Sequence, residues 1–246
     1  MRNTFVLFKR ELSAYFTTPV AYVFICIFLL MCGILTFYLG GFYDRGEASL
    51  GASFFQYHPI LYILLIPAIS MRLWAEERKQ GTIELLMTLP VTLPQLVLSK
   101  FLAAWAFAGI ALALTFPLWV TVNYLGDPDN GVIAASYLAS WLMAGGYLAM
   151  GACVSATTKN QVVAFVLSVI LCLLFLITGV PAVGDLLGAV IPSDTLVDAI
   201  RSFSFLSHFD SISRGVIDVR DLVFFASLIG VFLFMNAIAI ELKKAE

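Results

Sequence analysis

The residues of this chain best suited to chemistry lie in one charged segment, residues 72–100. Its sequence is RLWAEERKQGTIELLMTLPVTLPQLVLSK, and it holds seven charged residues of both signs, five of them within residues 72–79. These acidic and basic side chains can form ion pairs, but they make no pattern of catalytic residues. A plain connector needs only to be soluble, whereas Leu85, Leu86 and Leu89 would give this one an exposed apolar surface. The segment is therefore either a well-ordered connector or a surface on which a partner docks.

Local sequence signals divide this segment into two short helices joined by a sharp turn. Arg72–Gln80 should continue the preceding apolar run as a polar helix, and Gly81 is a natural helix terminator. Ile83–Leu89 can form a short helix, which Pro90 stops. Residues 92–95 resemble a capping box that opens the next helix. We therefore expect a compact knob rather than an extended loop.

The chain lacks the motifs of several enzyme classes. No glycine is followed by lysine, so the phosphate-binding loop G-x-x-x-x-G-K-[ST] is absent. The patterns H-E-x-x-H and G-x-S-x-G are also absent, and the two histidines are His58 and His208. Proton- or ion-driven transporters place ionisable groups within the bilayer, and the apolar runs hold none at depth. We therefore expect no catalytic residue, no metal and no cofactor in this chain, so that energy for transport would come from another subunit.

The composition places the chain in a membrane. It is 61% hydrophobic and only 12% charged over 246 residues, whereas an ordinary globular domain carries about a quarter charged residues. Fourteen basic and sixteen acidic residues cannot supply the polar shell of a soluble enzyme of this size. The net charge is −2 and no basic patch stands out, so nucleic acid is not an expected partner. The expected partner of the surface is the lipid bilayer.

Six apolar runs are each about long enough to cross a bilayer as a helix. They are Val20–Tyr43, Phe54–Met71, Phe101–Gly126, Ser136–Ala156, Val162–Val180 and Leu222–Ile240. The expected fold class is therefore all-α, a polytopic membrane protein with six transmembrane helices, in which residues 1–246 form a single transmembrane domain. Pro117 should kink the third run, and Thr158-x-x-Gln161 has the spacing of a capping box that opens the fifth.

Residues 1–18 precede the first run and predict an amphipathic helix in the membrane interface. One helical face over residues 3–16 carries the apolar side chains Phe5, Phe8, Leu12, Tyr15 and Phe16, and the charged Lys9 and Arg10 lie elsewhere. This helix is either a simple anchor or a lever that also touches a cytoplasmic partner.

Residues 181–221 separate the fifth and sixth runs and are too polar to span. Ala182–Ile191 and Thr195–Phe205 predict short amphipathic helices on the outer side of the membrane. They would form either a structured cap over the bundle or a surface that contacts substrate.

Charge counting predicts the orientation. With the N-terminus in the cytoplasm, ten basic residues lie inside and four outside, which the positive-inside rule favours. The inside set is Arg2, Lys9, Arg10, Arg72, Arg78, Lys79, Lys100, Lys159, Lys243 and Lys244, and the outside set is Arg45, Arg201, Arg214 and Arg220. Both termini are therefore expected in the cytoplasm.

Several of these features together resemble an ABC-2-type permease, and the charged segment carries the resemblance best. Residues 76–86 read EERKQGTIELL and are followed by Leu89-Pro90-Val91 and Lys100, similar to the E-R-x-x-G-T-x-E-x-L-x-x-x-P pattern of that family's coupling loop. The opening Phe8-Lys9-Arg10-Glu11-Leu12 matches the family's start. Residues 158–161 and 208–218 resemble the branch associated with gliding-motility ABC exporters.

The resemblance implies how such a chain would work. Two permeases, as a homodimer or a paired permease, would face each other above two ABC ATP-binding subunits, which bind the ATP. An auxiliary extracytoplasmic subunit could join them. The residues implied in coupling to the ATP-binding subunit are Glu76, Glu77, Arg78, Gly81, Thr82, Glu84 and Pro90, with Lys9, Arg10 and Glu11 of the interfacial helix. None would be catalytic.

Two other functions remain open from the residues alone. The chain could be a membrane anchor through which an ATPase drives a mechanical or assembly event without transport. It could also be a lipid-modifying enzyme, which the lack of converging His, Asp or Lys side chains disfavours. Substrate identity is not encoded in any motif of the chain.

Overall fold

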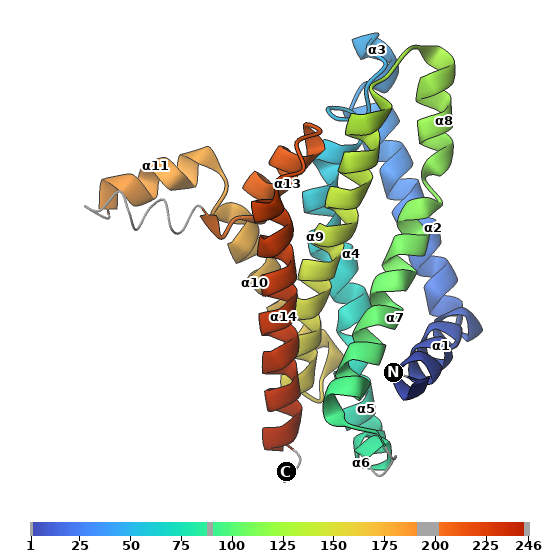
Figure 1. The fold of residues 1–246 in the computed structure, drawn as a ribbon, viewed down its shortest axis with the longest axis vertical. Coiled ribbons are helices and arrows are strands. Elements are labelled where there is room, and N and C mark those ends of the chain that lie inside the picture. The colour runs from blue at the N-terminus through green and yellow to red at the C-terminus, as the bar shows by residue number, and fades with distance from the viewer. Residues whose placement is uncertain (1, 88–90, 191–201, 244–246) are drawn as a thin grey trace.

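The computed structural model describes residues 2–87, 91–190 and 202–243, and every regular element in these ranges is a helix (Figure 1). The elements are α1 (Arg2–Thr17), α2 (Pro19–Ile34), a π-helix (Leu35–Leu39), α3 (Phe42–Arg45), a 3-10 turn (Phe55–Tyr57), α4 (His58–Ser70), α5 (Arg72–Gln80), α6 (Thr82–Met87), α7 (Leu93–Ala113), α8 (Phe116–Leu125), α9 (Asn130–Thr157), α10 (Gln161–Ile177), α11 (Pro181–Val190), α13 (Phe205–Ser213) and α14 (Val219–Leu242). For these residues the all-α prediction is confirmed.

The long helix α9 forms the centre of the bundle. It packs against α14, α4, α10, α13 and α7 (Figure 1). Small residues let the neighbours approach closely: a Cβ at Gly145 would lie 2.7 Å from Cε2 of Trp105, which is too near for an ordinary contact. Helices α1, α5 and α6 and the C-terminus gather at the end of the bundle drawn lowermost, called here the lower end, and α3 and α13 lie towards the opposite, upper end.

Five stretches of helix are long and apolar enough to span a membrane in the described part of the chain. They are Pro19–Arg45, Phe55–Gln80, Leu93–Leu125, Asn130–Thr157 and Val219–Leu242. The fifth predicted span corresponds to the 17-residue helix α10, which is apolar but clearly shorter than the other five stretches, of 24 to 33 residues. A membrane protein with several apolar helices is thus confirmed; where the sequence predicted six transmembrane helices, the described residues hold five candidate spans and one shorter apolar helix.

The third span is broken in the middle, as its proline predicts. Helix α7 ends at Ala113 and α8 begins at Phe116 with Pro117 in its first turn. Proline lacks the N–H that would continue the hydrogen-bond ladder, so a carbonyl of the preceding turn needs another donor. That carbonyl belongs to Ala113, four residues before Pro117; the neighbouring carbonyl of Leu112 accepts from the hydroxyl of Thr115 at 2.6 Å and from its N–H at 3.0 Å.

The first span ends in a π-helix rather than in a regular α-helical turn. The N–H of Gly40 donates to the carbonyl of Leu35 at 2.6 Å, five residues back. The carbonyl of Gly40 in turn accepts a hydrogen bond from Nε of Arg45 at 2.7 Å. The wider turn thus ends at a residue whose N–H and C=O are both bonded.

One prediction about the later helices needs correction. The capping box at Thr158 is wrong, because α10 begins at Gln161 and its cap is Asn160, whose side-chain oxygen accepts from the N–H groups of Val162 and Val163. The side-chain oxygen of Asn160 accepts directly from the first free N–H groups of α10. The hydroxyl of Thr158, two residues earlier, does not reach these groups.

Of the two helices expected between residues 181 and 221, the first corresponds to α11 at Pro181–Val190. The second, Thr195–Phe205, falls mostly outside the described residues. Helix α13 at Phe205–Ser213 was not expected. It is held to α14 by a buried pair, in which Nδ1 of His208 lies 2.6 Å from Oδ1 of Asp221.

Candidate functional site

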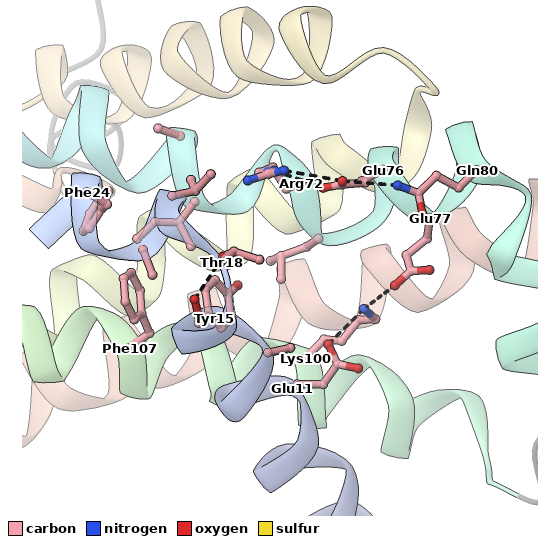
Figure 2. Close-up of a pocket in the computed structure, with 16 residues that line it drawn as sticks. Glu11, Tyr15, Thr18, Phe24, Arg72, Glu76, Glu77, Gln80, Lys100 and Phe107 are labelled. Carbon is pink, nitrogen blue, oxygen red and sulfur yellow. Dashed lines mark hydrogen bonds and ion pairs between the residues drawn. The ribbon is translucent and has the colours of Figure 1, made fainter.

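Three charged side chains from three helices meet at the lower end of the bundle (Figure 2). Nζ of Lys100, on α7, lies 3.2 Å from Oε2 of Glu11 on α1 and 2.9 Å from Oε1 of Glu77 on α5. The Lys100 side chain is only 5% exposed. Burying an ammonium group is costly unless carboxylates accept its hydrogen bonds, and here two carboxylates do. The lysine therefore holds α1 and α5 to the base of α7; we call Glu11, Glu77 and Lys100 the ion cluster.

The ion cluster extends to the start of α6. The hydroxyl of Thr82 donates to the Glu77 carboxylate and lies 3.3 Å from the Glu77 carbonyl. Nζ of Lys100 also lies 5.6 Å from the ring centroid of the buried Trp74, within the range of a cation–π contact. The first residue of α6 is therefore joined to the same lysine that fixes α1.

Aromatic packing fixes the other end of α1 against α7. The ring of Tyr15 stacks on Phe107 with centroids 4.9 Å apart, and Phe16 meets the same ring edge-on at 5.8 Å. Burial raises the pKa of the Tyr15 phenol far above its usual value, the Glu11 carboxylate raises it further, and Arg72 opposes both. The phenol is therefore neutral. Helix α1 is held to α7 by the charge of Glu11 and, one turn later, by the apolar contacts of Tyr15 and Phe16.

A pocket of about 240 Å³ lies beside the ion cluster, between α1, α2, α4, α5 and α7 (Figure 2). Its apolar wall includes Phe24 and Phe107, and its polar wall includes Arg72 and Glu76. Nε of Arg72 lies 2.9 Å from Oε2 of Glu76, so these charges neutralise each other. Among the described residues no group of three or more His, Cys, Asp or Glu could hold a metal ion. The arrangement is suited to linking helices rather than to a reaction.

Helix α5 is fixed to the central helix by one serine. Oγ of Ser155, on α9, accepts hydrogen bonds from the N–H groups of Trp74 at 3.1 Å and Ala75 at 3.0 Å, and it donates to the carbonyl of Met71 at 2.9 Å. These backbone groups lie where α4 gives way to α5, and the start of a helix leaves N–H groups without partners. Ser155 supplies the partners from another helix.

Arg78 connects α5 to the ends of two long helices. Its guanidinium donates to the carbonyls of Ala156 at 2.6 Å and Lys243 at 3.4 Å. Nζ of Lys243 donates to the carbonyl of Thr157 at 2.6 Å. Cations at helix C-termini satisfy free carbonyls and interact favourably with the helix dipole. Arg78 thus acts within the chain, as a link between α5, α9 and α14.

The structure brings some of the sequence-predicted coupling residues together and leaves others apart. Glu11, Glu77 and Thr82 meet at Lys100, and Arg10 pairs with Glu11 at 2.8 Å. Glu76 pairs with Arg72 at the pocket, and Arg78 is turned inward. These residues form the inner part of the predicted set.

The outer part of the predicted set faces away from the bundle or forms the turn. Gly81 has φ +72° and ends α5, as predicted, so that α6 can fold back. Glu84 and Lys9 are exposed, and the neighbouring Leu85 is 68% exposed. Pro90 lies outside the described residues.

Lys100, Ser155 and Trp74 are site residues that sequence reasoning did not select. Lys100 carried one usable signal, because it is a lone charge two turns into a helix, directly before a long apolar run. Such a charge must find partners in the bundle. Ser155 and Trp74 lie in apolar surroundings and carried no comparable signal.

Comparison with known proteins shows the family of the chain. The sequence model of a protein family described as "ABC-2 family transporter protein" matches residues 6–242. The chain is also 31% identical over 137 residues to the probable multidrug ABC transporter permease YbhS of Escherichia coli strain K12, and equally to that of strain O157:H7. That alignment covers 52% of this chain and 36% of the relative, so the chain spans about a third of the relative's length. The family match covers nearly the whole chain, and the chain belongs to the ABC-2 family of transporter proteins.

Proposed function

We propose that this chain is the membrane permease subunit of an ABC exporter, which couples ATP hydrolysis by a separate ATP-binding subunit to movement of a substrate. The observation that carries the proposal is the ion cluster, in which Lys100 joins the helix before the first span to the segment between the second and third. A rigid junction of these parts is what a permease needs if force applied at α6 is to reach the spans.

The transmission would begin at α6, the outermost element of the lower end. The turn at Gly81 presents Glu84 and Leu85 away from the bundle. A displacement of α6 would reach Lys100 through Thr82 and Glu77, and then α1 through Glu11. Since packed elements shift as units rather than deform, α1, α5 and the base of α7 would move together.

The lower end would face the cytoplasm, because the positive-inside count favours it and the ATP-binding subunit works there. α10 would then be the fifth of six spans. Residues 1–18 would lie in the interface as an amphipathic helix, and α11 and α13 would lie outside. The chain would be a multi-pass protein of a bacterial cytoplasmic membrane, and the gliding-motility-like branch, favoured by the motif at residues 208–218, is part of the proposal.

The complete exporter would contain two permeases and two ATP-binding subunits. Large apolar side chains of α2, α10 and α14 are exposed on the single chain, among them Ile27, Val166 and Phe234. Lipid covers some of this surface, and a second permease would cover another part and complete a pathway between the two. ATP would be bound by the partner, and this chain would hold no cofactor of its own. An auxiliary outer subunit would rest on α11 and α13.

The test is to reverse one exposed charge on α6 and measure binding of the ATP-binding subunit. Glu84→Lys should weaken co-purification and uncouple ATP hydrolysis from transport, because losing a buried interface pair costs about 2–5 kcal/mol. Glu47→Lys changes an equally exposed glutamate beyond the upper end of the first span and should leave both readouts unchanged.

If α6 were only a connector, Glu84 would remain solvated, and its reversal would cost about 0–1 kcal/mol. Parent-like binding and transport by Glu84→Lys would therefore remove α6 as the docking element. A different outcome is that the parent and every variant bind the ATP-binding subunit and support ATP hydrolysis but transport nothing. That outcome would favour the membrane-anchor function over the exporter.

A further inference from the structure

We propose that the groove between α1, α7 and α9 binds one anionic phospholipid, with an acyl chain in the groove and the headgroup at Lys9. The groove has a volume of about 520 Å³ and lies along the N-terminal part of α1, whereas the pocket of Figure 2 lies along its C-terminal part. It is lined by Phe5 and Phe8 of α1, Leu98 and Leu102 of α7 and the two tryptophans Trp105 and Trp141. This site does not depend on the proposed function.

The floor of the groove is apolar although it contains two indoles. The rings of Trp105 and Trp141 stack with centroids 4.1 Å apart at 9°. Nε1 of Trp105 donates to the carbonyl of Trp141 at 2.8 Å, and Nε1 of Trp141 donates to the carbonyl of Trp105 at 3.4 Å. Both donors are therefore occupied, and the floor offers ring surface rather than hydrogen bonds. An apolar chain fits such a surface, whereas a polar ligand would lose its hydrogen bonds to water.

Two glycines make room for the two tryptophans that form the floor of the groove. A Cβ at Gly109 would lie 2.9 Å from Nε1 of Trp141, and a Cβ at Gly145 would lie 2.7 Å from Cε2 of Trp105. Both contacts are closer than real Cβ atoms allow, so each glycine makes room for the tryptophan of the opposite helix. The groove is thus a consequence of tight α7–α9 packing, not of a gap between loose helices.

The rim of the groove carries a cation. Lys9 directly follows the groove-lining Phe8 and stands one helical turn after Phe5, at the edge of the apolar face of α1, and it is exposed. Among the described residues no ion pair is formed by Lys9, whereas its neighbour Arg10 pairs with Glu11. A lysine near an anionic lipid surface contributes to attraction, and its long stem lets the ammonium reach the headgroup level. An anionic head above an apolar tail is the complement of this groove.

A lipid suits the groove better than a second copy of the chain. A helix is about 10 Å across and 5.4 Å per turn, so about 520 Å³ would hold little more than one turn. The same volume is within the range of pockets for small ligands, about 300–1,000 Å³. Phe5, at 66% exposed, forms one side of the groove and offers ring surface to an acyl chain.

The test uses tryptophan fluorescence of the purified chain in phosphatidylcholine vesicles. Equal minor fractions of brominated phosphatidylglycerol or brominated phosphatidylcholine are added, since bromine on the acyl chain quenches nearby indoles. We expect the anionic lipid to reach half-maximal quenching at about a fivefold lower fraction, the preference that one lysine near an anionic headgroup gives. Lys9→Gln should abolish this preference, and Lys9→Arg should keep it.

Two matched variants separate the groove from the general surface. Lys159→Gln removes another exposed lysine at the lower end, between α9 and α10, and should leave the preference unchanged. Ala106→Phe fills the groove and should reduce quenching by both lipids. Equal quenching by the two lipids in the parent, or equal loss in Lys159→Gln, would overturn the proposal. Absence of quenching by either lipid, with cross-links between copies across α1 and α7, would assign the groove to a second copy instead.

Discussion

At the scale of single residues, Lys100 has the largest consequence for stability. Its ammonium group is almost fully buried and bridges two carboxylates that belong to different helices. A buried ion cluster adds little net stability compared with apolar residues of the same shape, but removing one member leaves the others uncompensated. The cluster therefore fixes which parts of the chain lie together, and its loss is costly.

Replacing Lys100 with methionine should destabilise the protein by about 3 kcal/mol, because Glu11 and Glu77 then repel each other in a partly buried site. The measurement is the unfolding midpoint of the purified protein in detergent. Glu11→Gln and Glu77→Gln added to Lys100→Met should recover most of the loss, because no unpaired charge is then left. Lys159→Met, at an exposed lysine, is the control. Equal midpoints for Lys100→Met and Lys159→Met would contradict the importance of the ion cluster.

At the scale of secondary-structure elements, the turn between α5 and α6 depends on one glycine. Gly81 has φ +72°, in the left-handed region, and no atom lies within 4 Å of the position of a Cβ. A side chain there meets no neighbour, so its cost comes from the backbone alone. That cost is about 1–2 kcal/mol for an L-residue.

Gly81→Val should therefore move α6 or destabilise the turn, while Gly81→Asn should be better tolerated, because asparagine adopts the left-handed region more readily. Protease sensitivity of the α5–α6 turn in membranes provides the measurement. Gly33→Ala is the control, since Gly33 lies in regular helix with open space around its Cβ position. A valine variant as resistant as the parent would show that α6 keeps its place without this turn.

The elements that could be predicted from sequence follow rules that act over a few residues. Gly81 ends α5 as expected, and the N–H of Thr92 donates to Oε1 of Gln95 at 3.2 Å, as part of the predicted capping box. The break at Pro117 is equally local. In each case the cause and the effect lie within one helical turn.

What could not be predicted depends on segments far apart in the sequence. Lys100 meets Glu11 across 89 positions, and Ser155 meets Trp74 across 81. A serine hydroxyl in an apolar run has many possible partners, and only the packing of α9 against α5 selects them. Arg78 was selected for a partner outside the chain, but packing turns it inward to two helix ends. Composition places charges in segments, and packing decides which of them face solvent.

At the scale of the whole molecule, α10 decides the topology. Its 17 residues make about 25 Å of helix, at the short end of what a bilayer of about 30 Å accepts. If it spans, both ends of the chain lie on one side. If α10 does not span and α14 does, the α9–α10 connection and the end of α14 lie on opposite sides of the membrane. If neither helix spans, the two lie on the same side.

Reporter fusions should therefore place the end of α14 and the α9–α10 connection on the same, cytoplasmic side. Fusions in the turn at Asp127–Gly131 should report the opposite side. The positive-inside count supports this assignment. A fusion after Lys243 that reports the same side as the turn at 127–131 would remove α10 from the set of spans.

The π-helix at Leu35–Leu39 has a consequence for how relatives of this chain are compared. A π-turn accommodates one more residue than an α-turn, so it is equivalent to a single-residue insertion that the helix has absorbed. Helical residues that follow such a turn are rotated by about 100° relative to an uninterrupted α-helix; here the helix breaks just beyond the turn, where Gly41 has φ +55°. A relative that lacks one residue here would keep a straight helix, and an alignment of the two should open its gap at residues 35–39 rather than in the loop that follows. A one-residue insertion or deletion can thus fall inside a membrane helix, where the length of the helix alone would not reveal it.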